Sequence, residues 1–553
     1  MPHAHRTWRH WLPFLNWPRP TGALLRQDVL AGITVALLLV PQSVAYAQLA
    51  GMPLVTGLYA AILPAALGAL LGGSTRLSVG PTALTCLLVS ASLTGLAEPG
   101  SPQWVQGAIW LALLSGLMQA LLGLGGFGWL LNLISSPVMT GFTQAAALLI
   151  IGSQLPALLG LPKGVLESWQ LGLAPDGQAM AFGLGTLALL WIARQRWPRF
   201  PAIMLVVVGA GLISHFSGFD GAVIGTLPAG LPSLSLPDWL GLSTLQALIL
   251  PAMMIALVSF LETASSARTE HQRDGTLWNE SQDLLGQGVA KLSAALSGTF
   301  PTSASFSRSA IYLQTGARSG WASLVTAAVV LLAVLLAPLL KDVPRAVLAA
   351  VVVIAVMGLV KPSALRRLWR TGRVEALTAS ATFVITLLSA PMIYWGVLAG
   401  VVLTLSHFLH ARLHPRIIEI GLHPDGSMRD RHLWKLPPLA PHLYTLRMDA
   451  ELDFAAATSL ERAITEHLGE HPDVRHVWLL AQPINRIDIT GIETFGQIRR
   501  QLAARQVVLH ISGIKLPVQT ALERAGEWTL NEQLRAYRTD TEALQALRAL
   551  AKD

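Results

Sequence analysis

Long apolar runs separated by short loops occupy most of this chain. Between residues 29 and 412 the sequence is dominated by Ala, Leu, Val, Ile and Gly. A bilayer core about 30 Å thick is crossed by a helix of about 20 apolar residues. Within lipid the backbone must satisfy its own hydrogen bonds, and a chain with this pattern does so as helices. We therefore predict a polytopic α-helical membrane domain over residues 29–412.

The charged residues mark a second domain. Of the 39 Lys and Arg and 31 Asp and Glu, 35 follow residue 412. The whole 553-residue chain is only 13% charged, against about 25% in soluble proteins. We expect residues 1–28 to form a cytoplasmic N-terminal segment, residues 413–440 a linker, and residues 441–553 a soluble domain.

Fourteen membrane segments are expected, and two of them are too short to cross. They are 29–49, 54–71, 82–96, 105–124, 139–160, 178–194, 201–217, 245–267, 283–298, 306–316, 320–340, 345–359, 375–390 and 392–410. Basic residues collect in alternate loops, as the positive-inside rule requires of cytoplasmic loops. These loops hold Arg76, Arg194, Arg196, Arg199, Arg268, Arg273, Arg318, Lys361, Arg366, Arg367, Arg370 and Arg373, whereas the predicted outer loops hold Lys163, Lys341 and Arg345. Both termini are therefore predicted in the cytoplasm, at the cell inner membrane.

Two segments place proline and small polar residues at membrane depth, directly before a short helix. They are residues 77–82 and 300–308. Such interrupted helices in corresponding halves indicate a transporter site. An offset of 220 residues aligns Pro81 with Pro301 and Gln42 with Glu262, which predicts a seven-plus-seven inverted repeat.

Two half-helix N-termini that meet would attract an anion, because their free N–H groups carry partial positive charge. Arg308 would add a full charge. Glu262 is a carboxylate within an otherwise apolar span, where burial favours the protonated form, so it could carry a proton. The alternative is a structural ion pair between Glu262 and Arg308.

Three further polar residues lie within spans. Gln42 follows Pro41, which frees a carbonyl, so its amide could face a cavity. Tyr46, one turn later, would share that face or pack between helices. Lys291 is expected to snorkel to the cytoplasmic interface.

The chain resembles the sulfate permease (SulP) family of anion transporters. The resemblance rests on motifs at residues 41–47, 57–59, 78–82 and 305–310, and on the segment from Asn279 to Gly288. It implies a fourteen-segment inverted repeat with core and gate subdomains and an anion between the third and tenth segments. The site residues it implies are Gln42, Tyr46, Thr82, Ser305, Phe306, Ser307 and Arg308. Glutamate at position 262 implies proton coupling, since sodium-coupled bicarbonate carriers have aspartate there.

Two departures from the family pattern concern the tenth segment. Tyr312 replaces a usual asparagine, and residues 302–304 replace a more glycine-rich run. They put in doubt the identity of the anion and the packing of this segment.

From residue 441 strands and helices alternate, which predicts a small α/β domain. It resembles the STAS domain, with the specific match at residues 488–491. The resemblance makes Thr490 a candidate phosphorylation site. Thr490 and Glu493 also fit a capping box, which needs no regulation.

These observations favour a secondary transporter of small anions, with sulfate first, coupled to protons by alternating access. Bicarbonate or C4-dicarboxylate transport and anion exchange remain alternatives, as does a channel. A membrane-anchored sensor that signals through its STAS domain is an alternative from another class. No enzymatic activity, cofactor or metal is expected, because the spans lack a catalytic constellation. The expected partners are the anion, the proton, the bilayer and a second copy of the chain, and not nucleic acid.

Overall fold

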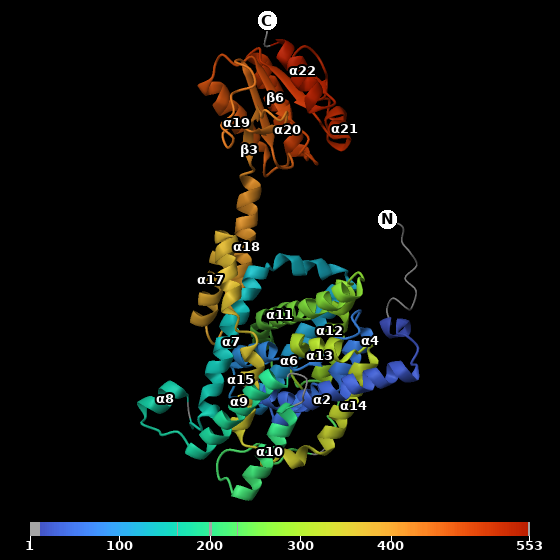
Figure 1. The fold of residues 1–553 in the computed structure, drawn as a ribbon, viewed down its shortest axis with the longest axis vertical. Coiled ribbons are helices and arrows are strands. Elements are labelled where there is room, and N and C mark those ends of the chain that lie inside the picture. The colour runs from blue at the N-terminus through green and yellow to red at the C-terminus, as the bar shows by residue number, and fades with distance from the viewer. Residues whose placement is uncertain (1–11, 163, 198–201, 229, 551–553) are drawn as a thin grey trace. The chain divides into compact units, whose positions relative to one another are not determined.

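A computed structural model describes residues 12–162, 164–197, 202–228 and 230–550 (Figure 1). The chain divides into a first unit that ends at Thr404 and a second unit that begins at Leu405. Of the predicted N-terminal segment 1–28, the part before residue 12 lies outside the described residues. The loop residues Lys163 and Arg199 lie outside them as well.

The first unit is almost wholly helical. Its longer helices are α2 (Gly22–Leu49), α6 (Pro102–Leu124), α7 (Ser136–Leu158), α9 (Gly177–Arg196), α10 (Ala202–Ser217), α11 (Leu242–Asp274), α12 (Glu280–Leu296), α14 (Trp321–Leu335), α15 (Arg345–Met357), α17 (Arg373–Leu388) and α18 (Tyr394–Leu413). Shorter helices are α3 (Leu54–Tyr59), α4 (Leu63–Leu71), α5 (Ala83–Leu93), α8 (Val165–Gln170), α13 (Phe306–Thr315) and α16 (Pro362–Thr371), with 3-10 turns η1 (Pro13–Asn16), η2 (Phe127–Leu133) and η3 (Ala337–Leu340). Each of the fourteen predicted segments contains a helix. Within the described residues, seven helical segments have the length and apolar composition to cross a membrane.

Helices α6 and α12 approach each other closely because glycines line their contact. A Cβ on Gly288 would lie 2.4 Å from the backbone nitrogen of Ala120, and one on Gly123 would lie 2.6 Å from that of Leu285. Small residues of this kind let membrane helices pack backbone against backbone. The two helices therefore pack as a close pair.

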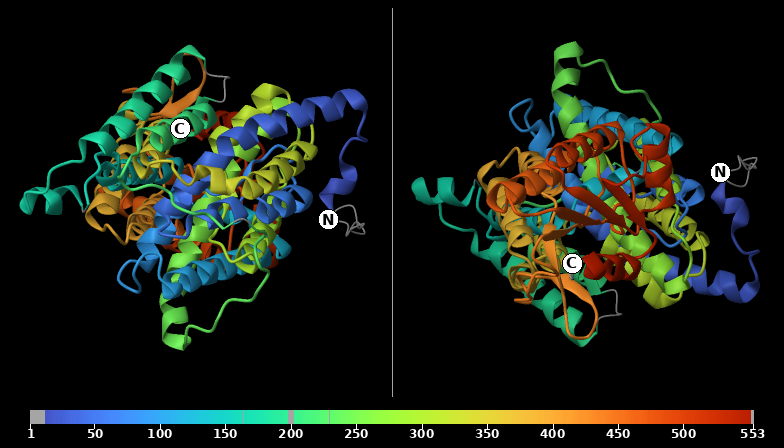
Figure 2. Two further views of the ribbon diagram at one scale, coloured as in Figure 1. Left: turned by 90° about the horizontal axis from the view of Figure 1, so that it is seen from below. Right: turned by 90° about the horizontal axis from the view of Figure 1, so that it is seen from above.

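The second unit is a six-stranded sheet with helices on both faces. Its strands are β3 (Ile417–Leu422), β4 (Met428–Asp430), β5 (Leu443–Met448), β6 (His476–Leu480), β7 (Val508–Ser512) and β8 (Leu534–Tyr537), in the order β4-β3-β5-β6-β7-β8. Strands β5 to β8 run parallel, and β3 is antiparallel to β5. The right-hand view of Figure 2 shows the sheet and its helices from above.

The core of the second unit has two layers. Helices α19 (Ala457–Glu470), α20 (Ile489–Ala504) and α21 (Leu516–Arg524) bury apolar side chains against one face of the sheet. Helix α22 (Asp540–Leu550) packs Ala543 and Leu547 on the other face, against Trp478. The alternation predicted from residue 441 onward therefore matches the arrangement of these elements.

The sheet begins earlier than expected. Residues 413–440, predicted to be a linker, contain β3 and β4, and Ile417 of β3 pairs with Met448 of β5. Strand β3 alternates between half-buried and buried positions over its first four residues, but it is only six residues long and only residues 414–416 separate it from the end of α18. A strand this short gives little periodic signal, and its place in the sheet, between β4 and β5, depends on those two partners.

Candidate functional site

Two-residue strands hold the starts of the two half-helices together. Val79–Gly80 forms β1 and Ser303–Ala304 forms β2, and they pair antiparallel with Gly80 opposite Ser303. The backbone N–H of Ser305 extends the pairing by donating to the carbonyl of Ser78 at 2.9 Å. Helix α5 begins at Ala83 and α13 at Phe306. Both half-helices therefore begin at this β1–β2 pair, which we call the crossing, and their N-termini meet there as the sequence predicted.

The repeat is not in the register that the prolines indicated. Helices α5 and α13 begin 223 residues apart, whereas the alignment of Pro81 with Pro301 uses an offset of 220. The chain after Pro301 is extended through β2 before the helix starts. The two half-helices still correspond to each other, but the offset between them is three residues longer than the offset between Pro81 and Pro301.

The residues before each half-helix cap it in different ways. The side chain of Thr82 accepts a hydrogen bond from the backbone N–H of Thr85, at 3.4 Å. Ser305 precedes α13 without a side-chain capping bond, and its Oγ lies 3.3 Å from Oγ of Ser307. The first turn of α13 thus keeps N–H groups that its N-cap side chain does not satisfy, and such groups favour an anion.

Arg308 is buried at the crossing, with 1% of its surface exposed. Its Nε donates to Ser78 Oγ at 3.1 Å, and its Nη2 donates to the carbonyl of Pro81 at 3.0 Å. Both contacts are neutral oxygens of the segment that leads into α5. The guanidinium therefore joins the two half-helices and carries a positive charge to the place where they meet.

Glu262 lies on α11 and contacts the other half-helix. Its Oε2 accepts a hydrogen bond from Thr82 Oγ1 at 3.0 Å. Among the described residues no ion pair within 4.0 Å joins Glu262 to Arg308. The structural pair that the sequence left open is therefore not formed, and the two charges occupy separate positions.

Two cavities reach the crossing from different sides. One of about 380 Å³ is lined by Gln42, Ser307 and Arg308, among others. The second, of about 660 Å³, is lined by Glu262 and Phe306, together with hydroxyl groups of α7. Phe306 and Ser307, which are adjacent at the start of α13, thus line different cavities. Glu262 and Arg308 also line different cavities.

Gln42 and Tyr46 differ in their surroundings. Gln42 is buried on α2, which continues through Pro41, and its Oε1 has no hydrogen-bond partner among the described residues. Tyr46 is 5% exposed and packs within the main apolar core, outside the linings of both cavities. Gln42 therefore lines the cavity that contains Arg308, whereas Tyr46 lines neither cavity.

The prediction for Lys291 is wrong. Its side chain is fully buried, and Nζ donates to Gln119 Oε1 on α6 at 2.8 Å. A Cβ on Gly116 would lie 2.8 Å from Cβ of Lys291, so α6 covers the start of this side chain. Lysines at the ends of spans reach water by extending along the helix, and here the neighbouring helix closes that route.

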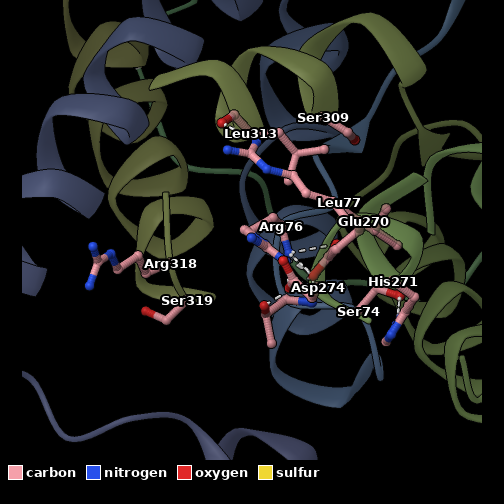
Figure 3. A network of polar contacts seen from close by, with 12 residues as sticks. Ser74, Arg76, Leu77, Glu270, His271, Asp274, Ser309, Leu313, Arg318 and Ser319 are labelled. Atoms are coloured by element: carbon pink, nitrogen blue, oxygen red, sulfur yellow. Dashed lines mark hydrogen bonds and ion pairs between the residues drawn. The ribbon is translucent and has the colours of Figure 1, made fainter. Parts of the chain in front are cut away.

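A polar network anchors the segment that leads into β1. Arg76 contacts Glu270 and Asp274 at the end of α11, with Nε 3.3 Å from Glu270 Oε1 (Figure 3). The carboxylate of Glu270 also accepts from the backbone N–H groups of Thr75 and Arg76. On the same helix, Arg273 donates to the carbonyl of Leu313 at 2.6 Å. The end of α11 therefore holds the segment before one half-helix and the end of the other.

The cap of α20 in the second unit is Asp488 and not Thr490. Asp488 Oδ1 accepts from the N–H of Gly491 at 2.8 Å, and Oδ2 accepts from that of Phe454 at 2.9 Å. Thr490 is exposed in the first helical turn. The capping box predicted from Thr490 and Glu493 is therefore wrong, because a carboxylate two residues earlier takes that role.

Two interrupted helices that meet at a buried arginine are typical of a polytopic transporter, and helix N-termini of this kind favour an anion. Residues 25–382 match the sulfate permease family, and residues 438–535 match the STAS domain. The chain belongs to the sulfate permease family. It is an anion transporter and not an enzyme, and the predicted fold is confirmed.

Individual relatives agree with this assignment. A probable sulfate transporter of Mycobacterium tuberculosis is 32% identical over 537 residues, 95% of each chain. The mouse anion transporter Solute Carrier 26 family member A9, in its inward-facing state, superposes with a TM-score of 0.88 over 99% of this chain and 96% of its own, at 19% identity. The transmembrane domain of the cyanobacterium bicarbonate transporter BicA gives 0.60 over 70% of this chain and 98% of its own, at 22% identity.

Proposed function

We propose that this protein imports sulfate together with protons across the cell inner membrane. The observation that carries the proposal is the buried Arg308 beside two half-helix N-termini, with the carboxylate of Glu262 nearby but unpaired with it. The anion class follows from the family, and sulfate follows from the description of the family and of the relative in Mycobacterium tuberculosis. The sensor alternative has no comparable support, since the named relatives are transporters.

In this proposal the anion binds at the β1–β2 crossing. Arg308 supplies the full positive charge, and the free N–H groups of α13 supply partial charge. The amide of Gln42 and the hydroxyl of Ser307 line the same cavity as Arg308 and donate hydrogen bonds. Thr82 and Ser305 are the N-cap residues of the two half-helices and border the proposed site there.

Phe306 and Tyr46 shape this site without donating charge. The ring of Phe306 is 48% exposed and borders the cavity that contains Glu262. Tyr46 supports α2 from the apolar core. Phe306 thus shares a cavity with the carboxylate, whereas Ser307 and Arg308 line the other cavity.

Glu262 is the proposed proton carrier. Its partner Thr82 is neutral, and its cavity contains hydroxyls and Arg268 and Lys361 at the rim, so a proton can reach it through water. A carboxylate locked to Arg308 could not exchange its proton in this way. Protonation removes a negative charge near the site, which favours anion binding, and the two events are therefore coupled.

The proposed orientation uses the basic residues at the cavity rims. Arg194 borders the cavity that contains Arg308, and Arg268 and Lys361 border the other. All three belong to loops that the positive-inside rule assigns to the cytoplasm. We therefore infer that both cavities open to the cytoplasm, that both termini lie there, and that alternating access moves the helices around the crossing relative to the rest of the membrane domain.

The second unit is proposed to act from the cytoplasm. Its STAS fold carries the exposed Thr490 as a candidate site of regulation. A homodimer is proposed on family resemblance, with this domain as one contact between copies. Residues 29–412 remain the proposed transport domain.

Uptake by purified protein in proteoliposomes tests the proposal. Labelled sulfate, bicarbonate and succinate are offered with and without an inward proton gradient. We expect sulfate to accumulate only with the gradient. Equal accumulation with and without it would contradict proton coupling, and transport that requires a counter-anion inside would indicate exchange. The fold shared with a bicarbonate transporter makes bicarbonate the second candidate.

Arg308→Ala tests the location of the site. We expect at least about tenfold weaker sulfate binding, because a buried charge-assisted contact contributes about 1.5–3 kcal/mol or more. Arg318→Ala is the matched control, since Arg318 is exposed. Unchanged affinity in a folded Arg308→Ala protein would exclude the proposed site.

A further inference from the structure

Lys291 is a buried cation that the proposed mechanism does not use. It is 0% exposed on α12, and among the described residues no carboxylate lies within 4.0 Å of Nζ. Its hydrogen-bond partner is Gln119 Oε1, a neutral acceptor at 2.8 Å. A buried charge without a counter-charge in ion-pair contact is costly and needs a compensating interaction.

The orientation of Gln119 fixes the orientation of Lys291. Nε2 of Gln119 donates to the carbonyl of Ala256 at 2.6 Å and lies 3.1 Å from Ser259 Oγ. Both amide hydrogens are therefore directed to α11, so the amide oxygen faces Lys291. An oxygen acceptor requires a donor opposite it, which is the role of the ammonium group.

Lys291 belongs to the wall of the anion crossing. Its neighbour Ala290 packs in one buried cluster with Val79 of β1 and Ala304 of β2. Hydrogen bonds connect Lys291 to the crossing as well. Gln119, the partner of Lys291, contacts Ser259, and the carbonyl of Ser259 accepts a hydrogen bond from Ser303 Oγ at 3.0 Å. The amine is thus connected through Gln119 and Ser259 to β2, the strand that precedes α13.

The charges around the crossing do not balance without an anion. Arg308 and Lys291 are positive, and Glu262 is the carboxylate beside them. Near the end of α11, Arg76 pairs with Glu270 and Asp274, and the buried Asp283 of α12 accepts hydrogen bonds from Ser74 and Trp278. Once Glu262 is protonated, two positive charges remain, and a divalent anion neutralises both.

We propose that Lys291 is the residue that selects a divalent over a monovalent anion. This inference rests on the proposed anion site at Arg308. The lysine acts through the low-dielectric wall without touching the anion, where charges are poorly screened and their interaction extends further than in water. A divalent anion in turn favours the ammonium form of Lys291, and a monovalent anion leaves one positive charge uncompensated.

The test compares sulfate with bicarbonate in proteoliposomes, for the wild type and for Lys291→Met. Methionine keeps the length of the side chain and removes its charge. We expect the ratio of sulfate to bicarbonate uptake to fall by about tenfold or more, since the charge acts twice as strongly on a divalent anion. Lys291→Arg should retain the ratio, and the exposed Lys341→Met is the matched control.

A second variant covers the case in which Lys291→Met does not fold. Gln119→Glu keeps the lysine and places a carboxylate on it, so the pair is neutral and the ratio should fall in the same way. An unchanged ratio in either folded variant would overturn the inference. A wild type that carries bicarbonate but neither sulfate nor succinate would overturn it too, while the proposed anion transport would stand. A wild type that carries no anion would contradict the proposed function itself.

Discussion

Thr82 Oγ1 lies 3.0 Å from Glu262 Oε2, and this bond joins a half-helix cap to the candidate proton carrier. The same hydroxyl caps α5 through the backbone N–H of Thr85. A hydroxyl can donate one hydrogen and accept others. Protonation of Glu262 would therefore change the hydrogen bonding of the cap that borders the proposed anion site, which gives a direct physical link between the proposed proton and anion sites.

Glu262→Gln should abolish uptake driven by a pH gradient, because an amide cannot carry the proton. Thr82→Val should weaken coupling, since it leaves Glu262 without its hydroxyl donor, and Thr82→Ser should preserve it. Initial rates of sulfate uptake at several pH values measure both effects. The exposed Glu98→Gln and Thr94→Val are the matched controls. A Glu262→Gln protein with the wild-type pH profile would rule out the coupling role.

Arg76→Met should destabilise the first unit by about 3–5 kcal/mol, because it leaves the buried carboxylate of Glu270 without its cation. The side chains of Arg76 and Glu270 are 10% and 5% exposed. The double variant with Glu270→Met should recover part of the loss, since no buried charge then remains unpaired. Thermal unfolding in detergent measures the changes, with the exposed Arg268→Met as control. Equal stability of Arg76→Met and wild type would show that the network contributes nothing.

Asp488→Ala should cost about 1 kcal/mol of stability in the second unit, because Asp488 caps α20. Thr490→Ala should change it by less than about 0.5 kcal/mol, as is usual for an exposed position without such a role. Chemical denaturation followed by Trp478 fluorescence compares the two. A larger loss in Thr490→Ala than in Asp488→Ala would reverse the assignment of the cap.

The second unit should become less stable as the pH falls below about 6.5. Burial, reinforced by the positive charges of His476 and Arg535, lowers the pKa of His510 from 6.5 to about 3. The unfolded chain therefore binds a proton in this range that the folded domain excludes. The stability that depends on neutral His510 is fully present above the pKa of this residue in the unfolded chain. It is lost as the pH falls from there toward the pKa in the folded domain.

Between pH 7 and pH 5.5 this single group should cost about 1 kcal/mol. Hydrogen exchange in β7 at the two pH values, corrected for the intrinsic rate, measures it. In the fold His510 lies 3.1 Å from both His476 and the hydroxyl of Tyr537. His510→Asn should flatten the pH dependence, and the exposed His432→Asn should leave it unchanged. An unaltered slope in His510→Asn would assign the effect to another group.

The interrupted helices could be predicted because proline and small polar residues at membrane depth are tolerated only where the backbone is buried in protein or lines a cavity. Their pairing through β1 and β2 could not, since a strand of two residues has no period. The position of β3 in the sheet could not be predicted either, because it depends on pairing with the distant strand β5. Local pattern predicted the elements, and contacts between distant segments decided how they meet.

Lys291 shows where reasoning from one helix fails. Its position on α12 fits a lysine that extends to the interface, and nothing nearby in the sequence contradicts this. Its partner Gln119 comes 172 residues earlier, on a helix brought close by Gly116 and Gly288. The burial of the lysine is a property of the helix pair, which no single-helix pattern contains.

The antiparallel pair of β1 and β2 places a local twofold axis between Gly80 and Ser303. An inverted repeat relates its halves by such an axis in the membrane plane. An anion bound at the proposed site would therefore lie close to this axis, where backbone from each half approaches it. Exchanging the conformations of the two halves would turn the site from one side of the membrane to the other while the ligand keeps nearly the same surroundings.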